Sequence, residues 1–270
     1  MEIDRNLKQL FSLEDKVILI TGASGGLGVE FSKSLAGLGA KIALCDIEYT
    51  KTKDLEREIL EQGNSAQTFK LDLADLDSVY NCVKNVISHY GRVDVLINNA
   101  AQNKREGFLD VEEVTFDRIM DVNVKGAFFL SQEIGRHMVE NKISGSIINV
   151  VSSNAVNMLG GLGVYGASKA AMWAITRAQA IELAKHNIRS NALSPGSTLT
   201  PLTAPIWSDP KRSDYLRERI AMARPANPED LLGMLVLLCS DASRYMTGTM
   251  HHVDGGYLAG GQPWPYDTAY

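Results

Sequence analysis

Short apolar runs alternate with longer amphipathic segments along almost the whole chain, and this alternation limits the possible folds most strongly. Several runs are apolar throughout, as strands are in a parallel sheet covered by helices on both faces. The expected strands are residues 17–21, 41–46, 66–71, 93–98, 146–152, 188–193 and 250–253. The expected helices are residues 27–38, 51–62, 76–90, 116–140, 165–185 and 228–240. Because such alternation is typical of right-handed βαβ units, the sequence predicts one α/β domain over residues 1–270 with a doubly wound, parallel, seven-stranded sheet.

The composition excludes several classes of partner. Lys and Arg number 27 against 32 Asp and Glu, with no basic block, so neither a nucleic acid nor an anionic membrane is expected as a partner. The longest apolar run, residues 231–238, is far shorter than the ~18 residues of a membrane span. Residues 1–16 mix charged with apolar residues, unlike a secretory signal, so a cytoplasmic location is expected. The three cysteines form no metal-binding or redox motif, which predicts buried free thiols and no metal site.

Two segments fall outside the regular alternation. Residues 197–227 contain Pro201, Pro205, Pro210 and Pro225 and form a long irregular stretch, which predicts a lid over a functional site. The aromatic tail, residues 258–270, is expected to pack against the protein, and in an oligomer it could reach a neighbouring active site. The alternative for the tail is a frayed terminus.

A glycine-rich turn follows the first expected strand. The chain reads Thr21-Gly22-Ala23-Ser24-Gly25-Gly26-Leu27-Gly28 where the strand meets a helix. Glycines let a pyrophosphate approach the backbone, and the helix start offers free N–H groups. A plain strand-to-helix turn is the alternative.

Asp46 ends the next expected strand, where an acid can bind the adenosine ribose and repel a 2′-phosphate. Ile47 and Glu48 follow it, with no adjacent Lys or Arg, so NAD is favoured over NADP. The alternative is a solvated acid at a strand end.

Tyr165 and Lys169 are four residues apart and share a helix face. A free tyrosine has a pKa of ~10, and a neighbouring ammonium lowers it toward useful acid/base chemistry. Such a pair also arises by chance on a solvated helix face.

Together these motifs resemble the short-chain dehydrogenase/reductase family over about residues 13–257. The matching pieces, in the family's order, are TGxxxGxG at 21–28, Asp72, Asn98-Asn99-Ala100-Ala101, Asn123, Ser152, Tyr165 to Lys169, Pro195-Gly196 and Val253-Asp254-Gly255-Gly256. Ala101 departs from the family, which more often has glycine there. The resemblance implies a Rossmann fold and an NAD-dependent oxidoreductase.

The resemblance also implies roles for individual residues. Tyr165 would be the general acid/base on the substrate oxygen, and Lys169 would lower its pKa and bind the nicotinamide ribose. Ser152 would orient the substrate oxygen, because the family spacing selects it over Ser153, and Asn123 would hold a water in the proton relay. The implied cofactor contacts are Gly22, Ser24, Gly26, Leu27, Gly28, Asp46, Ile47, Asp72, Leu73, Asn99, Ala100, Tyr165, Lys169, Pro195, Gly196, Thr198 and Thr200.

The substrate is expected to be a small polar molecule. The pattern resembles sugar-acid and polyol dehydrogenases of the gluconate 5-dehydrogenase type. The expected reaction interconverts a secondary alcohol and a ketone, or a lactol and a lactone, on a sugar, polyol or sugar acid. Besides Ser152 and Tyr165, Gln102 and Arg105 in the loop after residue 98 are candidate substrate-binding residues, and Arg105 could hold a carboxylate. The lid adds the cations Lys211, Arg212, Arg217 and Arg219. These charges could instead be a solvated face.

Other functions remain open. One alternative is a reductase of a less polar ketone, of the 3-oxoacyl or hydroxysteroid type. Another is a non-catalytic NAD-binding regulatory protein.

An oligomer is also expected. Residues 170–184 are apolar nearly all round, so that helix needs cover on both sides. Family habit implies a homodimer or homotetramer using the 116–140 helix, whereas the alternative is burial by the chain's own sheet and lid.

Overall fold

The computed structural model describes residues 7–201 and 203–260, and it confirms the predicted parallel sheet. Seven strands lie in the order β3-β2-β1-β4-β5-β6-β7, and each pair is parallel. Their bounds are β1 Val17–Thr21, β2 Lys41–Asp46, β3 Ser65–Lys70, β4 Val95–Asn98, β5 Ser146–Val150, β6 Arg189–Pro195 and β7 Met250–Val253. This is the doubly wound α/β fold that the alternation predicts.

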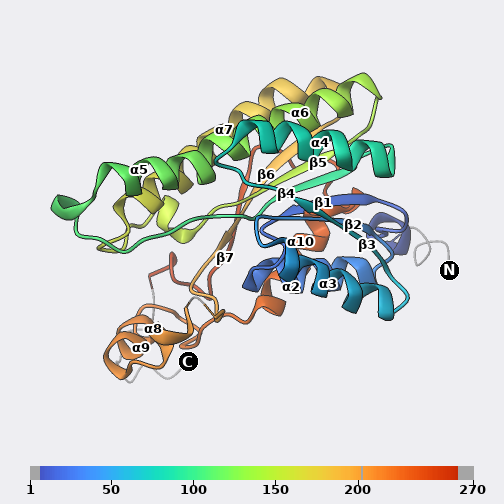
Figure 1. The fold of residues 1–270 in the computed structure, drawn as a ribbon. Coiled ribbons are helices and arrows are strands. Elements are labelled where there is room, and N and C mark those ends of the chain that lie inside the picture. The colour runs from blue at the N-terminus through green and yellow to red at the C-terminus, as the bar shows by residue number, and fades with distance from the viewer. Residues whose placement is uncertain (1–6, 202, 261–270) are drawn as a thin grey trace.

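Helices cover both faces of the sheet (Figure 1). One layer contains α2 (Gly26–Gly37), α3 (Tyr49–Glu61) and α10 (Leu232–Cys239). The other contains α4 (Leu76–Tyr90), α5 (Glu113–Met120), α6 (Ala127–Glu140) and α7 (Gly163–Leu183). Short 3-10 turns are at Phe108–Asp110, Ser153–Ala155, Ala184–His186, Pro228–Leu231 and Asp241–Ser243.

The period of two along β1 explains why the sheet has two cores. All five residues of β1 are buried. Ile18 and Ile20 pack on the α2 side with Phe31, whereas Val17 and Leu19 pack on the α4 side. Because successive side chains of a strand point to opposite faces, a fully apolar strand is stable only between two helical layers.

The helix expected at residues 116–140 is longer in the structure than expected, and its middle part is not α-helical. It begins at Glu113, and a π-helical segment, Asp121–Gly126, separates α5 from α6. Gly126 packs tightly there, since a Cβ atom on it would lie 2.0 Å from the Leu73 carbonyl oxygen. The widened turn contains Asn123, so this unpredicted π-helical segment positions one of the predicted site residues.

The lid contains two short helices, α8 (Ala204–Trp207) and α9 (Pro210–Arg217). A bridge between Thr198 and Ala226 joins its two ends next to β6. In Figure 1 the lid extends away from the sheet on the side where α5 also projects. The expected packing of the tail falls largely on residues 261–270, outside the described residues.

Two expectations about composition can be compared with the structure. Cys45, Cys82 and Cys239 are free and buried, as predicted. No helix in the described part of the chain is long and apolar enough to cross a bilayer.

Candidate active site

The glycine turn brings β1, α2 and the loop after β4 into close contact. Gly22 has φ +64°, and a Cβ atom there would lie 2.8 Å from the Ala100 Cα atom. Gly26 begins α2, and a Cβ atom on it would lie 2.9 Å from the Thr200 Cβ atom. A Cβ atom on the buried Gly28 would lie 2.0 Å from the Gly22 carbonyl oxygen, so Gly28 packs the helix against the turn. The glycines thus allow close packing of the turn, and Gly22 and Gly26 also line a cavity at the N-terminus of α2.

Asp46 is fixed beside this turn by three hydrogen bonds. Its Oδ2 atom accepts from the Ser24 backbone N–H (2.9 Å) and from the Ser24 hydroxyl (2.8 Å). Its Oδ1 atom accepts from the Glu48 N–H (3.0 Å). The carboxylate therefore has one defined orientation at the end of β2.

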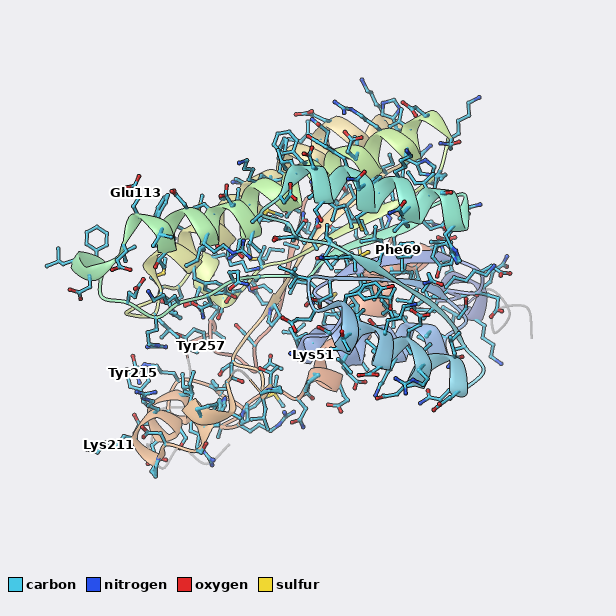
Figure 2. All side chains as sticks on the ribbon, in the orientation of Figure 1. Lys51, Phe69, Glu113, Lys211, Tyr215 and Tyr257 are labelled. Carbon is cyan, nitrogen blue, oxygen red and sulfur yellow. The ribbon has the colours of Figure 1, made fainter. Side chains whose placement is uncertain are left out.

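A cation that the sequence argument did not consider lies near Asp46. Lys51 lines the same cavity as Asp46 and pairs with Glu48 at 3.3 Å. Figure 2 shows Lys51 at the end of α3 nearer the lid. The prediction considered only the residues directly after Asp46, whereas the first turn of α3 brings Lys51 back to the site.

A cavity of about 740 Å³ runs from the glycine turn to Tyr165 along the carboxyl ends of the strands. Most of the predicted cofactor residues line it: Gly22, Ser24, Gly26, Leu27, Asp46, Ile47, Asp72, Leu73, Asn99, Ala100, Tyr165, Lys169, Pro195, Gly196, Thr198 and Thr200. The predicted residues Gly28, Asn123 and Arg105 do not line it, whereas Arg118, Val122, Val150, Val151, Pro201 and Thr203, which were not predicted, do. An elongated cavity with a glycine turn and a ribose-binding acid at one end fits a dinucleotide.

Asn99 joins two backbone turns that line the middle of this cavity. Its Nδ2 atom donates to the carbonyl oxygens of Thr21 (3.0 Å) and Gly22 (3.1 Å). In return the Thr21 hydroxyl accepts from the N–H groups of Asn99 and Ala100, each at 3.0 Å. The turns after β1 and β4 are thus joined, and their spacing is fixed before any ligand binds.

Tyr165 and Lys169 share one face of α7, as predicted, but their electrostatics differ from the prediction. The Lys169 Nζ atom lies 5.7 Å from the centroid of the Tyr165 ring and donates to the Val150 carbonyl oxygen at 2.8 Å. Burial lowers the pKa of Lys169 to about 8. Burial also raises the pKa of Tyr165, and the hydrogen bond with Ser152 only partly opposes this. The expected net lowering of the tyrosine pKa is therefore wrong for this structure, because desolvation outweighs the distant ammonium.

Ser152 lies just beyond β5, at the start of a 3-10 turn. Its Oγ atom accepts from the Asn154 backbone N–H (3.1 Å) and from Asn154 Nδ2 (3.2 Å). Because both of these contacts are accepted by Oγ, the Ser152 hydroxyl can donate its own proton, which it gives to Tyr165 in the hydrogen bond described above.

Asn123 makes hydrogen bonds to the Gln102 backbone and to the Ser168 side chain, both next to the site. Its Oδ1 atom accepts from the Gln102 N–H (2.7 Å), while Nδ2 donates to the Gln102 carbonyl (2.9 Å) and to Ser168 Oγ (2.9 Å). Ser168 in turn donates to the Tyr165 carbonyl at 2.7 Å. The buried amide thus ties the loop after β4 to the turn of α7 that carries Tyr165, leaving one Oδ1 lone pair and the backbone for any water.

The two predicted substrate residues are placed differently. Gln102 lines the cavity, and its backbone is fixed by Asn123. The Arg105 Nη1 atom donates to the Gly160 carbonyl at 3.1 Å, which joins the loop after β4 to the loop before α7. Lys104, beside it, pairs with Glu106.

Comparisons with known proteins agree with this geometry. A family model of the short-chain dehydrogenases, described as enoyl-(acyl carrier protein) reductase, matches residues 22–258. The 2-dehydro-3-deoxy-D-gluconate 5-dehydrogenase of Dickeya dadantii is 36% identical over 251 residues, covering 92% of this chain and 98% of that protein. The 3-oxoacyl-(acyl-carrier-protein) reductase FabG of Thermotoga maritima is 35% identical over 248 residues, covering 91% and 99%.

A solved structure is similar over the same range. The crystal structure of a Beutenbergia cavernae protein described as an NAD(P)-dependent gluconate 5-dehydrogenase, with bound NADP, has a TM-score of 0.88. The two chains are 34% identical, and the match covers 93% of this chain and 99% of that one. The sequence motifs, the sheet order and these matches agree: the chain belongs to the short-chain dehydrogenase/reductase family and is an oxidoreductase that uses a nicotinamide cofactor.

Proposed function

We propose that the protein is an NAD-dependent dehydrogenase that interconverts a secondary alcohol and a ketone on a sugar acid or a related polyol. The observation that carries this proposal is the group of Ser152, Tyr165 and Lys169 in the cavity that also contains the glycine turn and Asp46, with Ser152 and Lys169 buried and Tyr165 half-buried. The relatives named for 2-dehydro-3-deoxy-D-gluconate and gluconate support the substrate class.

Tyr165, Ser152 and Lys169 have separate roles in the proposed reaction. The nicotinamide, when bound, accepts a hydride from the substrate carbon or supplies one to it. Tyr165 removes the proton from the alcohol oxygen, or returns it to the ketone oxygen in the reverse direction. Ser152 orients that oxygen through its hydroxyl proton, and Lys169 supplies positive charge near Tyr165 and binds the ribose.

The preference for NAD rests on Asp46. Its three hydrogen bonds hold the carboxylate in one orientation, where it would accept hydrogen bonds from the ribose hydroxyls and repel a 2′-phosphate. The related Beutenbergia cavernae structure holds NADP, and Lys51 could in principle attract a phosphate. Because Lys51 is paired with Glu48, we propose that the charge of Asp46 dominates.

We propose that Gln102 and Arg105 bind the polar end of the substrate. Gln102 lines the cavity, and Arg105 lies three residues further along the same loop. Arg105 uses one guanidinium N–H group for Gly160 and makes no ion pair with an acid among the described residues, so other N–H groups are free for a carboxylate.

A substrate screen tests the proposed function. NADH formation is followed with sugar acids, alditols, aldoses and hydroxysteroids, and NADH oxidation with a 3-oxoacyl thioester, using the Tyr165→Phe variant as the blank. The proposal predicts the highest kcat/KM with a sugar acid or an alditol. Turnover of only the hydroxysteroids or the thioester would refute it.

We also propose a homodimer or homotetramer that buries the outer faces of α6 and α7. Ile181 on α7 is 79% exposed and Phe128 on α6 is 41% exposed, although both side chains are apolar. Light scattering should give a multiple of the 29.5 kDa chain mass, and Ile181→Glu should reduce it. Leu60→Glu, on the opposite helical layer, is the control, and a monomeric unmodified protein would refute the proposal.

The buried free cysteines support a reducing, cytoplasmic compartment. Cell fractionation tests this location.

A further inference from the structure

The cations of the lid differ in what surrounds them. Arg212 pairs with Asp209 and Arg224 pairs with Asp230. Lys211 lies at the outer end of the lid, away from the sheet (Figure 2). Arg219, in contrast, forms no ion pair with any carboxylate in the described part of the chain, and its side chain is partly buried. A partly buried arginine without an acid partner has unused capacity to bind an anion.

Arg219 is held rigidly by Tyr215, one helical turn before it. Its guanidinium carbon lies 3.5 Å from the centroid of the Tyr215 ring, and its Nη1 atom donates to the Tyr215 carbonyl at 3.1 Å. Stacking on an aromatic face fixes the plane of the guanidinium. Only one of its five N–H groups is used by this bond, so the rest can be presented in a fixed orientation.

Tyr257 completes a cluster with these two residues, which we name the lid cluster (Tyr215, Arg219 and Tyr257). Burial raises the pKa of Tyr257, Tyr215 raises it further, and Arg219 lowers it, so the three polar groups are close enough to interact. A backbone hydrogen bond also places these segments side by side. The Met222 N–H donates to the Gly255 carbonyl at 3.0 Å and so joins the lid to the loop after β7.

The two tyrosines of the lid cluster lie on the side of the lid that is nearer α5 (Figure 2). Figure 2 shows Tyr257 between the lid and the α5 side of the molecule, and Tyr215 on the lid opposite Lys211. Tyr257 also follows the carboxyl end of β7, the same edge of the sheet that carries the cavity with Tyr165. The lid cluster does not line that cavity, to which the lid contributes Thr198, Thr200, Pro201 and Thr203, so it lies outside the cavity at the same edge of the sheet.

We propose that the lid cluster is an anion-binding site that receives the carboxylate of the substrate and makes the enzyme selective for acids over neutral polyols. Arg219 donates two parallel N–H groups to the carboxylate oxygens, and the Tyr257 hydroxyl donates a third hydrogen bond. Tyr215 fixes the guanidinium and does not itself touch the anion. Arg105, on the loop after β4 and outside the cavity lining, would supply a second positive charge to the same carboxylate. This inference rests on the proposed sugar-acid function.

The test compares an acid with its neutral counterpart. The dissociation constants of D-gluconate and D-glucitol are measured with the protein–NADH complex by quenching of NADH fluorescence, and kcat/KM is measured for both compounds. The variants are Arg219→Gln, which removes the charge, Arg219→Lys, which keeps charge without the fork, and Tyr257→Phe. Lys211→Ala, which removes a lid cation outside the cluster, is the matched control.

Arg219→Gln should weaken gluconate binding by about tenfold to a hundredfold, the range for a lost charge-assisted hydrogen bond, and leave glucitol within about twofold. Arg219→Lys and Tyr257→Phe should show smaller losses for gluconate alone, and Lys211→Ala should change neither. Equal losses for the acid and the neutral compound, or no loss with Arg219→Gln, would overturn the lid site. Should Arg219→Gln fail to fold, Tyr257→Phe alone decides. If the unmodified protein binds and oxidises neither compound and no other sugar acid, the proposed function itself fails, which is a separate outcome.

Discussion

Replacement of Asp46 by alanine should convert the cofactor preference, and the structure indicates how. The carboxylate holds the Ser24 N–H, the Ser24 hydroxyl and the Glu48 N–H at 2.8–3.0 Å. In Asp46→Ala the negative charge is lost, and these three donors are released toward the space that a 2′-phosphate would occupy. The same change therefore removes a repulsion and creates an anion-binding pocket.

The size of the effect follows from electrostatics. Two unit charges about 4 Å apart interact by about 4 kcal/mol at an effective dielectric constant of about 20. Solvent screening at the open edge of the cavity reduces this, so we take about 2–4 kcal/mol for the repulsion. Because about 1.4 kcal/mol corresponds to a factor of ten, the ratio of kcat/KM for NADP to that for NAD should rise by roughly 30- to 1000-fold.

The assay measures kcat/KM for both cofactors in the unmodified protein, Asp46→Ala and the double variant Asp46→Ala/Ser24→Ala. The double variant lacks the released hydroxyl donor, so it should recover less NADP activity than Asp46→Ala. Equal kcat/KM for both cofactors in the unmodified protein, or an unchanged ratio in Asp46→Ala, would refute the reasoning.

Three further predictions concern the catalytic end of the cavity and its walls. Burial lowers the pKa of Lys169 to about 8, so the unfolded chain binds more protons between pH ~8 and ~10.4 and the free energy of unfolding should rise with pH across this window. Urea titrations at several pH values check this, and Lys169→Met should lack that part of the rise. Arg105→Ala should raise KM for a sugar acid by about tenfold or more and leave KM for the neutral alditol nearly unchanged; a parallel rise for both would instead indicate a structural role through Gly160. Asn123→Ala should lower kcat and speed hydrogen exchange in residues 101–106, because it removes both bonds to the Gln102 backbone; unchanged exchange there would contradict the role of Asn123 in fixing the loop.

The sequence predicted the fold well where a local pattern decides it. The fully apolar run of β1 can be stable only between two helical layers, and the glycine turn can occur only where a helix follows that strand closely. The bounds of β1, β2, β7 and α4 match the prediction, since each element ends at a strong change of pattern. The π-helical segment carries no such pattern, and it lies where Gly126 packs closely on Leu73, a contact between segments that are distant in the sequence.

The site was less predictable where it depends on contacts between distant segments. Lys51 lines the cofactor cavity from the first turn of α3, which starts at Tyr49, two residues earlier than expected. The bond from Arg105 to Gly160 joins residues 55 positions apart, and no spacing rule predicts it. The raised pKa of Tyr165 reflects burial, which a residue pattern on one helix does not reveal.

We propose that Tyr165 moves the proton, while the other residues of the site bind and orient the cofactor and the substrate. The most direct test measures kcat/KM of Tyr165→Phe with the best alcohol from the screen and, in the same preparation, the dissociation constant of NADH by fluorescence. We expect kcat/KM to fall by about 10²- to 10⁴-fold, the usual range for a lost general acid/base, and the dissociation constant of NADH to change by less than about twofold. A variant that retains more than about a tenth of the activity with normal NADH binding would contradict the account.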